Sequence, residues 1–110
     1  MAITVNIYYR GKDGNAVKFA KEMIASGIVD KIRKEKGNIR YDYFLPLNES
    51  DTVLLIDSWK DQTALDIHHK SPVMAQIVAL REKYDLHMKV ERYISDDNEV
   101  SELDKSFIRK

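Results

Sequence analysis

Two side chains in this sequence, His68 and Asn6, have types and positions that suit chemistry on a small molecule. The imidazole of His68 titrates near neutral pH, so it could act as a base or as an orienting donor in a pocket. The alternative is a helix histidine that bonds a backbone carbonyl or packs on Trp59, and the residues alone leave both open. Asn6 interrupts an apolar strand, so its amide needs either a permanent neighbour or a bound ligand.

Three further residues are candidates for contacting a substrate. Trp59 ends the most apolar strand, where a core residue with a bonded indole N–H is the simpler interpretation. Tyr8 shares a strand face with Asn6 and could share a pocket with it. Arg40 and Asp42 stand two apart on another strand, where they could pair with each other. We take Trp59, Tyr8 and Arg40 as candidate substrate-binding residues.

The composition excludes several other classes of site. Cysteine is absent, which removes disulfides, thiolate nucleophiles and cysteine-bound zinc, and fits a reducing compartment such as the cytoplasm. His68 and His69 are adjacent on a helix and diverge, so we expect no metal site. Eighteen basic and eighteen acidic residues give no net charge, so we expect no nucleic-acid or membrane partner. The first residues lack the pattern of a signal peptide or membrane span.

Hydrophobic periodicity predicts alternating strands and helices. Apolar residues recur with a period of two in three segments, which we expect to be strands at 3–9, 38–47 and 86–94, and the most apolar run predicts a further strand at 52–59. A helix should begin near Asp13 or Asn15 and, because Ser26-Gly27 interrupts its pattern, continue to Gly37 as one bent helix or two in tandem. Asp61 is placed to cap the next helix, and Pro72 to open another that ends near Lys83.

This order predicts an α+β domain over residues 1–94, with a ferredoxin-like antiparallel sheet and helices on one face. The other sheet face would be left bare in water, so we expect a symmetric homodimer that covers it. Residues 95–110 form a tail in which Leu103 and Phe107 stand four apart. A short helix that docks on the domain or on the partner subunit, and a frayed tail, both fit that spacing.

The run from Trp59 to Pro72 resembles the signature of the antibiotic biosynthesis monooxygenase domain. It has a strand-ending Trp, an Ala-Leu pair, His68 and the Pro that opens the next helix. The segment Gly37-Asn38-Ile39-Arg40-Tyr41-Asp42 is similar to the start of the family's second strand, and Asn6 extends the match. The resemblance covers roughly residues 3 to 94. It implies a dimeric α+β barrel with a pocket between sheet and helices in each protomer.

The same family contains several chemistries, so particular positions must distinguish them. Its haem-degrading members carry a Trp where this chain has His68 and an axial His where it has Val78, which disfavours haem degradation. Its quinol monooxygenases usually add a second His just after the Pro, and here that position is Val73. Neither substitution affects the expected fold.

Three functions remain open. The resemblance implies an oxygenase that uses no cofactor and acts on a quinol or phenol, with His68 as base or donor and Asn6 polarising the substrate oxygen. An isomerase of a phosphorylated carbonyl compound is favoured by the segment that contains Arg40. A dimer that binds a small apolar ligand without turnover is the third possibility.

Overall fold

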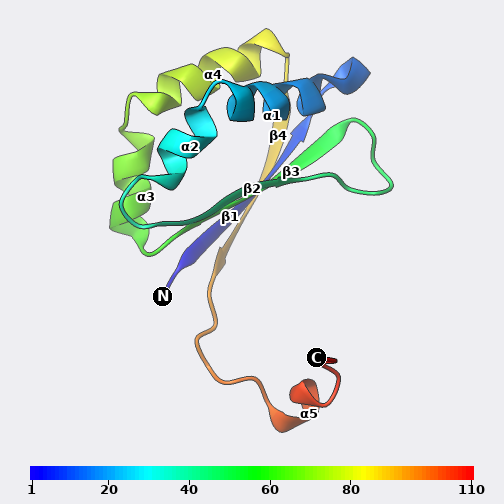
Figure 1. The fold of residues 1–110 in the computed structure, drawn as a ribbon, viewed down its shortest axis with the longest axis vertical. Coiled ribbons are helices and arrows are strands. Elements are labelled where there is room, and N and C mark those ends of the chain that lie inside the picture. Colours follow the sequence, from blue (N-terminus) through cyan, green and yellow to red (C-terminus); the bar gives the residue numbers. More distant parts are fainter.

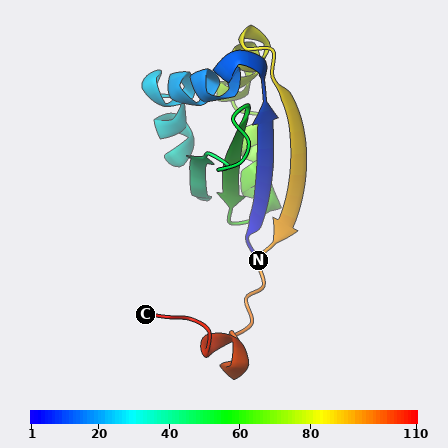
Figure 2. The same cartoon turned by 90° about the vertical axis from the view of Figure 1, so that its right-hand side faces the viewer.

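Four antiparallel strands form one sheet in the order β2-β3-β1-β4 in the computed structural model, which describes all 110 residues (Figure 1). The strands are β1 (Ile3–Arg10), β2 (Asn38–Phe44), β3 (Thr52–Trp59) and β4 (His87–Ile94). The helices of the domain lie on one side of this sheet (Figure 2); they are α1 (Asn15–Ala25), α2 (Ile28–Arg33), α3 (Gln62–His69) and α4 (Val73–Lys83). This arrangement confirms the ferredoxin-like α+β fold.

The helix ends show which local signals decide where each helix begins. Asp61 caps α3 as expected, because its side chain accepts a hydrogen bond from the backbone N–H of Ala64 at 2.8 Å. The cap expected at Asp13 or Asn15 is wrong. Gly14 stands before α1 without a side-chain bond, and Asp13 lies in the short 3-10 helix η1 (Lys12–Gly14) with a φ of 56°. A glycine in the left-handed region, Gly27, divides α1 from α2, so the helices run in tandem.

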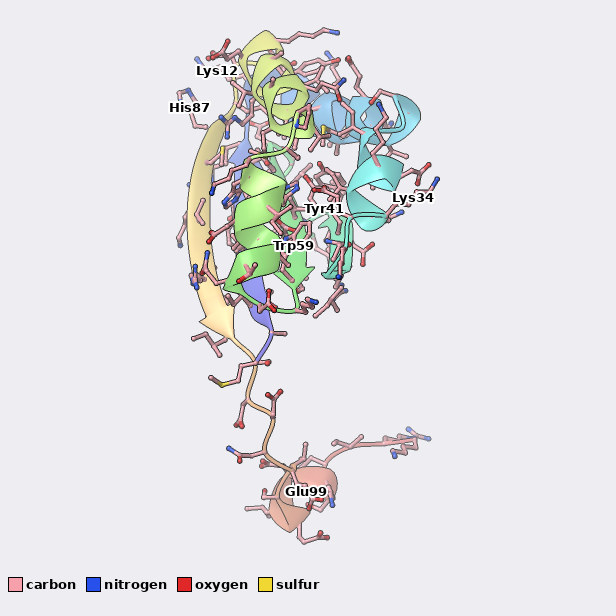
Figure 3. The ribbon with its side chains drawn as sticks, turned by 90° about the vertical axis from the view of Figure 1, so that its left-hand side faces the viewer. Lys12, Lys34, Tyr41, Trp59, His87 and Glu99 are labelled. Atoms are coloured by element: carbon pink, nitrogen blue, oxygen red, sulfur yellow. The ribbon has the colours of Figure 1, made fainter.

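The core lies between the sheet and the helices because alternate residues of each strand point toward them. Its largest fully buried side chains come from both layers, and they are Trp59, Tyr9, Phe19, Met23, Ile32, Leu55, Val29 and Val53. Figure 3 shows Trp59 and Tyr41 within this layer, whereas Lys12 and His87 lie at the far end of the domain. The apolar face of each helix therefore fixes its place over the sheet.

The opposite face of the sheet carries no helix (Figure 2). Its central residues are only partly buried, and they are Thr4, Asn6, Tyr8, Leu54 and Ile56. The face combines aliphatic, aromatic and amide groups. The bare face that the sequence analysis expected is therefore present.

The tail beyond β4 extends away from the domain (Figure 1). It contains the short helix α5 (Glu102–Lys105), which Ser101 caps by accepting a hydrogen bond from the N–H of Asp104. Leu103 and Phe107 are 71% and 81% exposed, so neither packs on the domain of its own chain. Docking of this tail on a partner subunit stays a prediction. None of the helices is both long and apolar enough to cross a lipid bilayer.

Gly37 lies in the turn between α2 and β2, where it packs against the start of α3, and it should tolerate no larger residue. Its φ is 87°, its carbonyl accepts from Lys60 N–H at 2.8 Å, and an added Cβ would lie 2.6 Å from the Cβ of Ala64. We expect Gly37→Ala to lower the free energy of unfolding by about 2 to 4 kcal/mol, since strain and a steric clash add. Chemical denaturation measures the loss.

Gly14→Ala is the matched control for this substitution. Gly14 has a φ of 75°, but nothing lies within 4 Å of its added Cβ, so only backbone strain should result. We expect a loss of about 1 kcal/mol for Gly14→Ala. Equal losses for the two variants would contradict the close approach of Gly37 to α3.

Candidate active site

A cavity of about 320 Å³ lies between the sheet and the helices α3 and α4. Ten of its fifteen lining residues are hydrophobic, so it suits a largely apolar ligand. The strand register orders its floor into rows across β3, β1 and β4. These rows are Asp57–Val5–Arg92, then Leu55–Ile7–Val90, and then Tyr9–Met88.

The roof of the cavity comes from one face of each covering helix. From α3 it receives Leu65, His68 and His69, and from α4 it receives Met74, Ile77 and Arg81. The α4 residues are spaced by three and four, so they form one stripe along that helix. The cavity therefore runs along the strands, with Asp57 at one end and Tyr9 at the other.

His68 is buried against an aromatic ring and a carboxylate. It is 3% exposed, and its ring stacks on Trp59 with the centroids 4.6 Å apart and the planes at 26°. Its Nδ1 lies 2.9 Å from Oε2 of Glu35. Burial lowers the pKa of His68, and the hydrogen bond with Glu35 partly opposes this shift. The neutral ring is then held with Nδ1–H donating to Glu35, which leaves a lone pair on Nε2.

Asp57 is the second titratable group of the cavity. It is 5% exposed, and its Oδ1 accepts a hydrogen bond of 2.6 Å from Nε1 of Trp59. Burial raises the pKa of Asp57 to about 7, the Trp59 hydrogen bond opposes the rise and the charge of Glu35 adds to it. A carboxyl group that is partly protonated at neutral pH thus shares an indole with His68. The two pKa shifts, one raised and one lowered, are typical of an acid and base pair.

Trp59 holds this pair in place and has no surface left for a ligand. Its exposed fraction is 0%, and it does not line the cavity. Its indole stacks on one titratable group and donates to the other. The core interpretation of Trp59 is therefore confirmed.

The other predicted site residues lie on the opposite face of the sheet. Alternation along β1 points Val5 and Ile7 into the cavity and turns Asn6 and Tyr8 away. Arg40 pairs with Asp42 at 3.0 Å, as its spacing suggested. The expected grouping of Asn6, Tyr8 and Arg40 with His68 does not occur within the chain, because a period of two separates the faces.

Asp57 and Glu35 are functional candidates that the sequence did not reveal. Glu35 stands in the charged run from Lys31 to Lys36, which has the composition of a solvated surface, yet its side chain is only 22% exposed. Asp57 had a weak signal, since it takes an inward position in the most apolar strand. Both depend on contacts between segments that are distant in the sequence.

Asp57→Asn should change how stability depends on pH. The pKa of Asp57 is about 7 in the fold and ~3.9 in an unfolded chain. The folded state therefore binds this proton more tightly, and the stability it gains is lost as pH rises through 7. The free energy of unfolding of wild type should therefore fall between about pH 5 and about pH 8, whereas that of Asp57→Asn should not fall for this reason. Relative to wild type, we expect the variant to become more stable by on the order of 2 kcal/mol over this range.

Urea unfolding of both proteins at the two pH values measures this difference. His68, whose lowered pKa weakens the fold on the acid side, is present in both proteins, so its contribution largely cancels. A difference between variant and wild type that stays constant with pH would show that Asp57 is an ordinary acid.

The fold and the cavity together define a ferredoxin-like α+β protein in which two buried titratable residues, His68 and Asp57, line an apolar cavity. Residues 2–80 match the model of the antibiotic biosynthesis monooxygenase family, and the chain belongs to this family.

Three relatives illustrate the similarity. YcnE of Bacillus subtilis (strain 168), a protein with the provisional name of a monooxygenase, is 30% identical over 77 residues, which are 70% of this chain and 79% of YcnE. A solved structure from Deinococcus radiodurans has a TM-score of 0.76 at 17% identity, covering 92% of this chain and 98% of that one. SnoaB, a cofactor-independent oxygenase from Streptomyces nogalater, has a TM-score of 0.72 at 9% identity, covering 88% and 95%. At these identities the two structures show a common fold.

Proposed function

We propose that this protein is a monooxygenase that needs no cofactor and oxidises a small hydroxylated aromatic compound, a quinol or phenol, in the cavity. The observation that carries the proposal is the pair of His68 and Asp57 at one end of an apolar cavity. Membership of the family supports a monooxygenase function, and the names of YcnE and SnoaB point the same way.

The reaction needs a base, and His68 has the required state. Its Nε2 lone pair takes the proton of the substrate hydroxyl, while Glu35 fixes the tautomer through Nδ1 and stabilises the imidazolium that forms. The resulting phenolate is electron-rich and reduces dioxygen directly. An apolar enclosure favours this step because it excludes water from the reactive oxygen species.

The second half of the reaction needs an acid, and Asp57 can supply it. Dioxygen adds to a ring carbon as a peroxide, and the protonated Asp57 donates to the distal oxygen as the O–O bond breaks. The ring carbon loses its hydrogen as a proton, and the product is a quinone with one molecule of water. The substrate supplies all four electrons that dioxygen takes up, so no external reductant is required.

His68→Gln should remove most of the activity. Loss of a general base typically costs ~100-fold to ~10,000-fold in rate, and glutamine cannot accept the proton. The measurement is oxygen uptake with 1-naphthol and related phenols, together with the incorporation of one atom of isotopically labelled dioxygen into the quinone. His87→Gln, an exposed histidine at the far end of the domain, is the matched control.

The pH profile of the same reaction tests the two roles separately. Activity should rise with pH as His68 loses its proton, below its ordinary range, and fall through about 7 as Asp57 ionises. Asp57→Asn should remove the alkaline limb together with much of the rate. Equal oxygen uptake by wild type and His68→Gln would overturn the proposal.

We further propose that the bare sheet face forms a homodimer, as its pattern predicted. The face is partly apolar, and Oδ1 of Asn6 is buried there without a hydrogen-bond partner in its own chain. A second copy, packed sheet to sheet, would cover the aliphatic groups and could supply a donor to Asn6.

Ile56→Glu tests this dimer, because Ile56 lies beside Asn6 at the centre of the face. Sedimentation should give a dimer of twice the chain mass of 12.8 kDa for wild type and a monomer for the variant, since a buried charge opposes association. Lys18→Glu, on the exterior of α1, should leave the mass unchanged. A wild-type protein that sediments as a single chain at every concentration would refute the dimer.

A further inference from the structure

The end of the cavity farthest from Asp57 holds a guanidinium without a charged partner. Arg81 lines the cavity from α4, and it forms none of the salt bridges of the chain. Its Nη1 donates to the sulfur of Met88 at 3.1 Å, which is a weak acceptor. The neighbouring carboxylates of Glu82 and Asp85 are both exposed, and neither forms a salt bridge with Arg81; Asp85 lies near His87 instead. An oriented guanidinium beside an apolar cavity is therefore left with its donors largely free.

Tyr9 adds a second donor at the same end. It shares the row of Met88 on the cavity floor, and it is 2% exposed. Burial raises the pKa of Tyr9, the charge of Arg81 lowers it, and the charge of Asp57 raises it. The hydroxyl thus stays protonated and can donate. Arg81 and Tyr9 both line the cavity, and a guanidinium and a hydroxyl are donors suited to a carboxylate.

The distance along the floor sets the size of such a ligand. Val5, in the row of Asp57, and Tyr9 are four residues apart on β1, which corresponds to about 13 Å between their Cα atoms. The long Arg81 side chain shortens the span that the ligand must fill. A ligand of two fused rings would then place a hydroxyl at His68 and an anionic group at Arg81. Met74 and Ile77, which line the cavity between these ends, would cover the rings.

We infer that the substrate is a hydroxylated bicyclic aromatic acid, whose carboxylate is bound by Arg81 and Tyr9 at the end of the cavity opposite to His68 and Asp57. This inference rests on the proposed function for its hydroxyl end. The carboxylate end can be tested without any reaction. It predicts selection of acids over neutral compounds of equal shape, which the hydrophobic lining alone would not produce.

The test is calorimetric titration with 2-naphthoate and with its methyl ester, neither of which has a hydroxyl to oxidise. We expect the acid to bind wild type at least about tenfold more tightly than the ester, because the carboxylate gains charge-assisted hydrogen bonds. Arg81→Gln should abolish this preference while leaving the affinity for the ester unchanged. Circular dichroism confirms that the variant is folded.

Two other arginines serve as comparisons. Arg10 follows Tyr9 on β1 but lies outside the cavity, so Arg10→Gln should keep the preference for the acid. Arg92 lines the opposite end and donates to Gln62. Loss of the preference in Arg92→Gln but not in Arg81→Gln would overturn the assignment, and so would equal binding of acid and ester by wild type. Failure of oxygen uptake with intact acid selection would instead count against the oxygenase proposal alone.

Discussion

The site depends on the buried indole of Trp59. One face of the ring stacks on His68, and the N–H binds Asp57, so a single side chain positions two titratable groups from different elements. The same contacts exclude water from both groups, and this desolvation is the largest cause of each pKa shift. Because burial disfavours charge, it lowers the pKa of the imidazole and raises that of the carboxyl. The opposite protonation states that acid and base catalysis needs therefore follow from one packing arrangement.

The sheet divides the remaining tasks between its two faces. Residues of β1 that point toward the helices form the cavity floor, and the residues between them form the bare face. Asn6 shows how strictly this division holds, since a shift of one position would place it beside Asp57. Ligand chemistry and the proposed association of two chains consequently use different residues of the same strands.

Local signals in the sequence were sufficient for most of the fold. The bounds of β3 and the capping of α3 by Asp61 follow from residues within a few positions of each other, so both were predicted correctly. The cap of α1 was not, because a left-handed turn through Gly14 replaces a side-chain bond. The site was harder to predict. His68 was recognised by its chemistry, whereas Glu35 acquires its role only because α2 and its following turn pack beside α3.

Glu35 provides His68 with a carboxylate partner in a chain that has valine at position 73. In quinol monooxygenases that this chain resembles, a second histidine usually stands at that position. Here Val73 is 9% exposed and borders the same small hollow as Glu35. The carboxylate of Glu35 contacts His68 directly, and it can accept a hydrogen bond from Nδ1–H. Because a carboxylate stabilises an imidazolium more strongly than a neutral ring does, the proposed role of His68 as a base does not require a histidine at position 73.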